Sequence, residues 1–240
     1  FSSRRRHTRS PRGSRVLGDV YKRQATRHPA MIERIVSNGH EIASLGWEHV
    51  RVSKQKRKVF REDITRTRAL LEDLSGQIVK GYRAASYSIG RNNLWALDEL
   101  AEAGYTYSSS IVPVHHQYYG MADAPRFAFP ASEGRILEIP ITTISVANWN
   151  INCSGGGWFR LFPYDFISWA IKQINEQDLQ PSVFYIHPWE IDPEQPRPDG
   201  LNLKTRFRHY VNLDKTYARL EKLGDDFQWG RMDEVFLAES

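Results

Sequence analysis

The spacing of hydrophobic positions divides most of the chain into helices and strands. Apolar residues recur every three or four positions, as on one face of a helix, in the ranges 29–38, 57–74, 92–103, 163–175 and 214–223. Short apolar runs beside turn residues, typical of buried strands, occupy 40–44, 78–82, 105–107, 136–146, 182–187 and 227–229. Since these runs alternate with helices, the pattern predicts an α/β fold with βαβ units and a largely parallel sheet.

One long stretch, residues 108–135, shows neither pattern and contains three prolines. A loop of this length inside a compact domain is usually functional or mobile. Within it, His115-His116 and Tyr118-Tyr119 form a cluster of rings. Ordinary loop packing and a lid that contacts sugars both fit this cluster, and the residues alone leave the two interpretations open.

Composition and charge limit the class of protein. The 240 residues suffice for one sizeable domain, and no apolar run approaches the ~18 residues that span a membrane. The single cysteine, Cys153, excludes an internal disulfide framework. Residues 1–24 carry seven Arg and one Lys against one Asp, a net charge of +7. Since the whole chain has a net charge of +5, residues 25–240 have a net charge of −2. The body of the chain is therefore not a basic nucleic-acid binder.

The basic segment itself has no hydrophobic period with which to pack against a core. Residues 15–24 resemble translated sequencing-adapter read-through, and we interpret residues 1–24 as a non-native or disordered basic arm. A genuine nucleic-acid-binding tail or an Arg/Ser-rich transit peptide is the alternative. We expect the folded domain to comprise residues 25–240.

Three strand-like runs each deliver a functional side chain just past their C-terminal ends. His49 follows the run 40–44, Arg83 follows 78–82, and His187 ends 182–187. Parallel α/β sheets and barrels carry their chemistry at the edge formed by these ends. We therefore expect the three side chains to converge on one pocket.

The sequence around these residues resembles a known family. The stretches that carry the resemblance include Gly-His-Glu-Ile-Ala-Ser-Leu-Gly-Trp-Glu-His at 39–49, Gly-Tyr-Arg-Ala-Ala-Ser-Tyr-Ser-Ile at 81–89, Gly-Gly-Gly-Trp-Phe-Arg-Leu at 155–161 and His-Pro-Trp-Glu-Ile-Asp-Pro at 187–193. They are similar to the polysaccharide deacetylases of the NodB-homology group (carbohydrate esterase family 4). The resemblance covers residues 25–236 and is closer to the branch associated with exosortase and PEP-CTERM exopolysaccharide gene clusters.

The resemblance implies a fold and an activity. The fold would be a deformed (β/α) barrel, here N-terminally truncated, because the family's first strand should lie before Ala25. The activity would be removal of N-acetyl groups from N-acetylhexosamine units of an exopolysaccharide, in the cytoplasm or envelope of a bacterium. The family uses a divalent metal, usually zinc, held by one Asp and two His.

The resemblance also implies roles for single residues. His49 matches the second ligand His of the family's His-x-x-x-His pair, whereas Leu45 stands at the first and cannot coordinate a metal. His187 matches the catalytic acid, and Arg83 matches the arginine that orients the catalytic Asp and touches substrate. That Asp belongs to the strand expected before Ala25, so we expect this copy to be impaired.

The remaining candidates lie near these positions. We predict that Trp189, Tyr87, His116 and Tyr119 bind the sugar and that Glu190 braces His187. His209, between basic residues, fits either a solvated face or a substrate contact. The triple glycine at 155–157 is interpreted as a tight loop near the barrel mouth, because no P-loop lysine follows it. A carbohydrate-binding pseudoenzyme without metal is the alternative to the enzyme.

Overall fold

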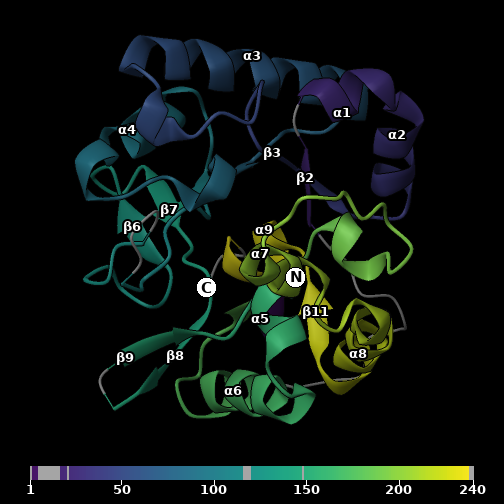
Figure 1. The fold of residues 1–240 in the computed structure, drawn as a ribbon. Coiled ribbons are helices and arrows are strands. Elements are labelled where there is room, and N and C mark those ends of the chain that lie inside the picture. Colours follow the sequence, from purple (N-terminus) through teal and green to yellow (C-terminus); the bar gives the residue numbers. More distant parts are fainter. Residues whose placement is uncertain (1, 5–16, 21, 116–119, 148, 238–240) are drawn as a thin grey trace.

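The centre of the molecule is a six-stranded sheet, shown in Figure 1. This computed structural model describes residues 2–4, 17–20, 22–115, 120–147 and 149–237. The strands follow the order β2 (Leu17–Val20), β3 (Glu41–Ser44), β4 (Gly81–Tyr82), β5 (Tyr107–Ser108), β7 (Ile136–Glu138) and β6 (Phe129–Ala131). Neighbouring strands are parallel except β6 and β7. The parallel C-terminal ends therefore meet at one edge, as the sequence predicts.

Two smaller sheets complete the strands of the described residues. One is antiparallel, with β1 (Ser2–Arg4) between β10 (Ser182–Val183) and β11 (Gln228–Gly230). The other is a hairpin of β8 (Thr143–Val146) and β9 (Trp149–Asn152), which extends at the lower left of Figure 1.

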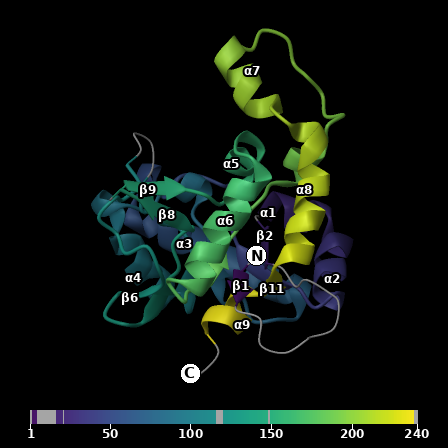
Figure 2. The ribbon, with the colours of Figure 1, turned by 90° about the horizontal axis from the view of Figure 1, so that it is seen from below.

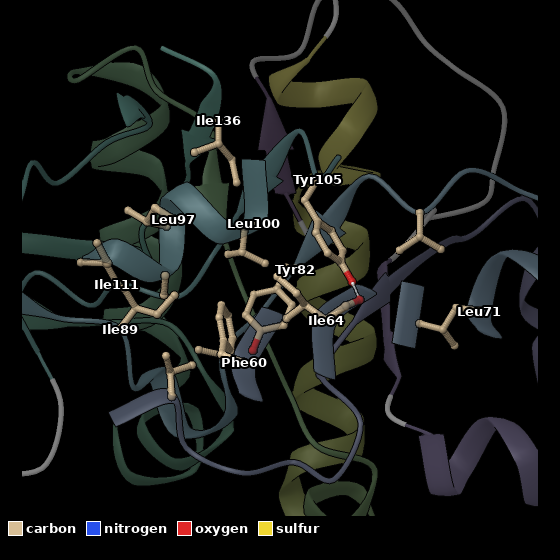
Figure 3. Packing of buried hydrophobic residues seen from close by; sticks show 14 of the residues in the cluster. Phe60, Ile64, Leu71, Tyr82, Ile89, Leu97, Leu100, Tyr105, Ile111 and Ile136 are labelled. Atoms are coloured by element: carbon tan, nitrogen blue, oxygen red, sulfur yellow. Dashed lines mark hydrogen bonds between the residues drawn. The ribbon is translucent and has the colours of Figure 1, made fainter. Parts of the chain in front are cut away.

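Four helices and a shared core cover one side of the large sheet. These are α1 (Lys22–Arg27), α2 (Pro29–Ser37), α3 (Arg57–Ser75) and α4 (Trp95–Glu102); in Figure 1 α3 runs along the top, α4 lies at the left, and α1 and α2 lie at the upper right. The predicted apolar face of α3 is buried at Phe60, Ile64, Thr67 and Leu71. Figure 3 shows Phe60 and Ile64 among Tyr82 and Tyr105, with the Phe60 and Tyr82 ring centroids 5.8 Å apart. Burial of this face stabilises α3 against the sheet.

The second half of the chain forms its own core around α6 (Tyr164–Glu176). The inward residues Ile167, Ala170, Ile171 and Ile174 are buried, as their spacing predicts, and they belong to one cluster with Phe159 and Phe184. The remaining helices are α5 (Gly156–Leu161), α7 (Leu203–Tyr210), α8 (Leu213–Asp226) and α9 (Met232–Phe236). Short 3₁₀ turns are η1 (Val52–Lys54), η2 (Ala85–Tyr87), η3 (Arg91–Asn93) and η4 (Pro188–Ile191).

Two helices differ from the sequence-based expectation. Residues 156–161 form α5 where a tight loop is expected, and residues 203–210 form α7 between the predicted strand at 182–187 and the predicted helix at 214–223. α5 contains two glycines, and α7 buries no residue, so neither shows the apolar period on which the prediction depends. Asn202 caps α7, its side chain accepting from the Thr205 N–H at 2.9 Å.

The start of the sheet is a correction. We expect residues 1–24 to lie outside the fold and the domain to lack its first strand, but Leu17–Val20 form β2 and pair in parallel with β3, Leu17 opposite Glu41 and Val20 opposite Ser44. An open strand edge accepts an extended segment through backbone hydrogen bonds, which require no hydrophobic period. As for membranes, none of the described helices has the length and hydrophobicity of a membrane-spanning segment.

Candidate functional site

His187 is the centre of the site, and a buried carboxylate holds its ring. His187 Nδ1 lies 3.0 Å from Glu190 Oε2, and the His187 backbone N–H donates to the same oxygen at 2.9 Å. Glu190 Oε1 accepts from Arg160 Nη2 at 3.1 Å, and both of these side chains are only 2% exposed. Since a carboxylate only accepts, its contact with Nδ1 selects the tautomer of His187 that carries the proton there. The ring nitrogen Nε2 is then left to exchange a proton with a substrate.

The charge state of Glu190 follows from its surroundings. Burial alone would raise the pKa of its carboxyl, but hydrogen bonds from the ring and backbone of His187 and the charge of Arg160 outweigh that effect. The pKa of Glu190 is therefore below its ordinary value, and the carboxyl is ionised at neutral pH.

The triple glycine lets the backbone of α5 approach this carboxylate closely. A Cβ on Gly156 would lie 1.9 Å from Glu190 Oε2, and one on Gly155 would lie 2.3 Å from the Tyr185 ring. Gly155 also has φ +98°, in the region that favours glycine. Gly157 has open space at the same position. The first two glycines are thus explained by close packing against Tyr185 and Glu190, not by phosphate binding.

Two tyrosine rings lie between Arg83 and His187, and each contacts one of them. Its Nη1 donates to Tyr87 Oη at 3.0 Å, and the Tyr87 and Tyr185 ring centroids are 5.1 Å apart. Tyr185 in turn meets His187 edge to face, with centroids 5.8 Å apart. The ends of β4 and β10 therefore present Arg83 and His187 to one continuous group of side chains.

His49 lies near His187, at the end of the loop that follows β3. It has φ +54°, an uncommon conformation that histidine tolerates better than most residues. The loop is anchored by Asp63 of α3, whose Oδ1 accepts from the Trp47 N–H at 2.9 Å. Burial lowers the pKa of His49, and the charge of His187 lowers it further. A neutral histidine is in the protonation state that binds a metal.

The described residues do not by themselves make a metal site. Leu45 is partly buried at the end of β3, where the resemblance expects a ligand, and its side chain has no donor atom. Within the part of the chain that the structure describes, no group of three His, Cys, Asp or Glu side chains could hold a metal ion. Among the described side chains, His49 is the one that matches a ligand of the family's pattern.

Trp189, which we predict to contact the sugar, packs against the rings of two histidines. Its ring stacks on His209 with centroids 4.3 Å apart and planes 7° apart, and it lies 5.9 Å from the His187 ring. One face of Trp189 is thus covered by α7. His116 and Tyr119, the other two predicted sugar contacts away from the strand ends, lie outside the described residues.

Sequence reasoning missed two buried charged residues at the site. Arg160 gives no signal because it follows the glycines in an unpredicted helix. Glu138, at the end of β7, accepts from the backbone N–H groups of Ser110 and Ile111 at 2.8 Å each. Burial raises the pKa of Glu138, while the charge of Arg83 offsets part of that rise. Glu138 is the one acidic residue in the otherwise apolar run 136–141, and this pattern could have indicated a buried carboxylate.

Two family models match the chain in succession. The polysaccharide deacetylase model matches residues 19–108, and the model of a domain of unknown function, DUF3473, matches residues 109–237. The second match covers more than half of the chain. No curated protein sequence matches it.

Solved structures share the fold. A protein described as a polysaccharide deacetylase from Mycobacterium smegmatis has 21% identity and a TM-score of 0.56, over 90% of this chain and 69% of its own. The Puue allantoinase has 17% identity and a TM-score of 0.52, over 88% and 62%. The Bc1960 peptidoglycan N-acetylglucosamine deacetylase has 15% identity and a TM-score of 0.48, over 94% and 77%. The first two likenesses confirm the predicted α/β fold of the NodB type.

Proposed function

We propose that this chain, which belongs to the DUF3473 family and matches the polysaccharide deacetylase model over residues 19–108, removes acetyl groups from N-acetylhexosamine units of an exopolysaccharide. The observation that most supports this proposal is that Glu190 fixes the ring of His187 close to His49. The exopolysaccharide assignment rests on the resemblance to the exosortase-associated branch, with which a DUF3473 half is compatible.

The reaction hydrolyses an amide. Water adds to the acetyl carbonyl carbon, the C–N bond breaks, and the products are acetate and the free amine of the sugar. An amine leaves only when it is protonated, and a positioned histidine that supplies this proton contributes about 10²–10⁴ in rate. His187, whose Nδ1 proton is held by Glu190, would take up a proton at Nε2 as the water adds and would then give it to the leaving amine. Arg83 and Tyr87 would orient the sugar beside it.

The family's metal, usually zinc, would polarise the carbonyl and activate the water when bound. We propose that this copy is impaired in that respect, because Leu45 stands where the family has a ligand His and His49 is the one described side chain that matches the pattern.

Leu45 supports a second candidate function. A chain that keeps His187, Arg83 and Tyr87 but lacks a ligand could bind the polysaccharide without cleaving the acetamide. The two candidates make different predictions for the same sample, because binding needs only the rings and polar groups, whereas hydrolysis also needs an activated water.

The test measures acetate release and binding together. The full chain and its His187→Ala variant would be incubated with chitin oligomers and Zn²⁺, and oligomer binding would be measured by calorimetry. Acetate release by the full chain that the variant loses supports the deacetylase. Binding without acetate release supports the pseudoenzyme. An oligomer that neither binds nor reacts contradicts both.

A further inference from the structure

α7 stands out because it packs so little and yet contacts the site so closely. No residue of α7 is buried, and Figure 2 shows the helix projecting from the rest of the ribbon beyond α5 and α8. An exposed helix of eight residues has little stability of its own. Two sets of contacts nevertheless connect its C-terminal end to His187.

The first connection is aromatic. His209 of α7 stacks on Trp189, which is itself stacked at 23° to His187. His209 Nε2 lies 3.1 Å from Gln195 Oε1, and Gln195 Nε2 donates to the Trp189 carbonyl at 2.8 Å. The contact with Gln195 thus fixes the rotation of the His209 ring, and stacking on Trp189 fixes its plane.

The second connection is ionic and passes through Arg160. Arg160 Nη1 donates to the His209 carbonyl at 2.6 Å, while its Nη2 donates to Glu190 Oε1 at 3.1 Å. Glu190 Oε2 holds the ring and the backbone of His187. One guanidinium therefore joins the end of α7 to the carboxylate that orients His187. A planar guanidinium fixes the angle between its two partners in a way that a lysine ammonium does not.

Stability alone does not explain this buried pair. Removing both charges of a pair from water usually costs as much as their attraction returns. The Nε of Arg160 is also buried without a hydrogen-bond partner among the described residues. A buried ion pair that costs free energy but fixes the angles between its partners is suited to positioning a neighbouring side chain.

We propose that Arg160 is a positioning residue that couples the placement of α7 to the orientation of the His187 ring. α7 thereby becomes the specificity element of the site, because a polysaccharide that contacts α7 acts on His187 through Arg160 and Trp189. The role of His187 as a reacting group rests on the proposed function, but the coupling does not.

The test observes the histidine rings directly, so it does not depend on deacetylation. The full chain would be labelled with ring-¹⁵N histidine, and the signals of His187 and His209 would be assigned by substitution. The variants are Arg160→Gln, Arg160→Lys and the matched control Arg219→Gln. Arg219 donates from Nη1 to the carbonyls of Phe159 and Phe162, at 3.0 and 3.3 Å, and to that of Arg160 at 3.4 Å. These contacts reach the backbone at α5 and involve neither the Arg160 side chain nor Glu190.

In the unsubstituted chain we expect the His187 ring to occupy the single tautomer with the proton on Nδ1. Arg160→Gln should average the two tautomers and shift the His209 signals, Arg160→Lys should do so partly, and Arg219→Gln should do neither. A lower unfolding temperature with unchanged ring signals in Arg160→Gln would mean a purely structural role and would overturn the proposal.

A further variant keeps the test decisive where Arg160→Gln fails to fold. His209→Ala removes the stacked ring from a partly exposed position but retains the carbonyl that Arg160 binds. We expect the His187 signals to change in this variant as well. Unchanged His187 signals in both His209→Ala and Arg160→Lys would show that α7 and His187 are independent.

Discussion

A methyl group added to Gly156 tests the packing of the site most directly. The Cβ of Gly156→Ala would lie 1.9 Å from Glu190 Oε2 and 2.2 Å from its Cδ. Ordinary van der Waals contact begins at 3.4 Å, so the contact is about 1.5 Å too short. Either the carboxylate leaves its place between Arg160 and His187, or α5 moves away from η4.

The expected cost follows from what the carboxylate holds. Breaking a buried ion pair while one charge stays behind costs about 3–5 kcal/mol, and Arg160, only 2% exposed, would be that charge. Overpacking with backbone movement costs about 1–3 kcal/mol instead. We therefore expect Gly156→Ala to lower the free energy of unfolding by about 3 kcal/mol and to release the His187 ring.

The neighbouring residue is the control. Gly157 belongs to the same helix and has no atom within 4 Å of an added Cβ. Gly157→Ala should raise the free energy of unfolding by up to about 1 kcal/mol, through the better helix propensity of alanine. Urea unfolding followed by circular dichroism measures both. Equal stability of the two variants would refute the packing of Gly156 against Glu190.

Three further predictions concern other parts of the molecule. Burial and the nearby Asp233 raise the pKa of Glu41 from 4.5 to about 7, so its contribution to stability is full below pH 4.5 and is lost as the pH rises to 7. Urea unfolding at pH 4.5 and 8 should show a loss of about 3 kcal/mol that Glu41→Gln lacks; identical pH dependence would contradict this. Hydrogen bonds from Arg61 and Arg57 lower the pKa of Glu99, so Glu99→Gln should lower the melting temperature at pH 7 and cost less as the pH falls below 4.5. A constant difference would argue against the ion pairs. Leu45→His should raise the affinity for Zn²⁺ in calorimetry without acetate release, since two imidazoles leave a hydrolytic site one ligand short; acetate release by this variant would show that further ligands are already in place.

Local patterns determined much of the fold. The apolar spacing in 57–74 and 163–175 predicts α3 and α6 because a helix places residues three and four apart on one face, and those residues are buried in the structure. The polar residues after the apolar runs likewise predict which strand ends carry chemistry, since parallel strands end at one edge. The sequence therefore predicts that His49, Arg83 and His187 share one site, and it identifies Leu45 as a departure from the family's pattern; the roles of these residues stay predictions.

The tertiary structure decided how those residues are held. Arg160 and Glu190 are 30 residues apart, and Arg160 and His209 are 49 apart, so no periodicity connects them. The same holds for the pairing of residues 17–20 with β3, which backbone hydrogen bonds make along an open strand edge. A contact between distant residues exists only once the chain has closed the loop between them. Local helix and strand propensities carry no information about which distant segments come together. Once those segments are packed, a buried charge requires an oppositely charged partner, and this requirement decides which charged residues pair.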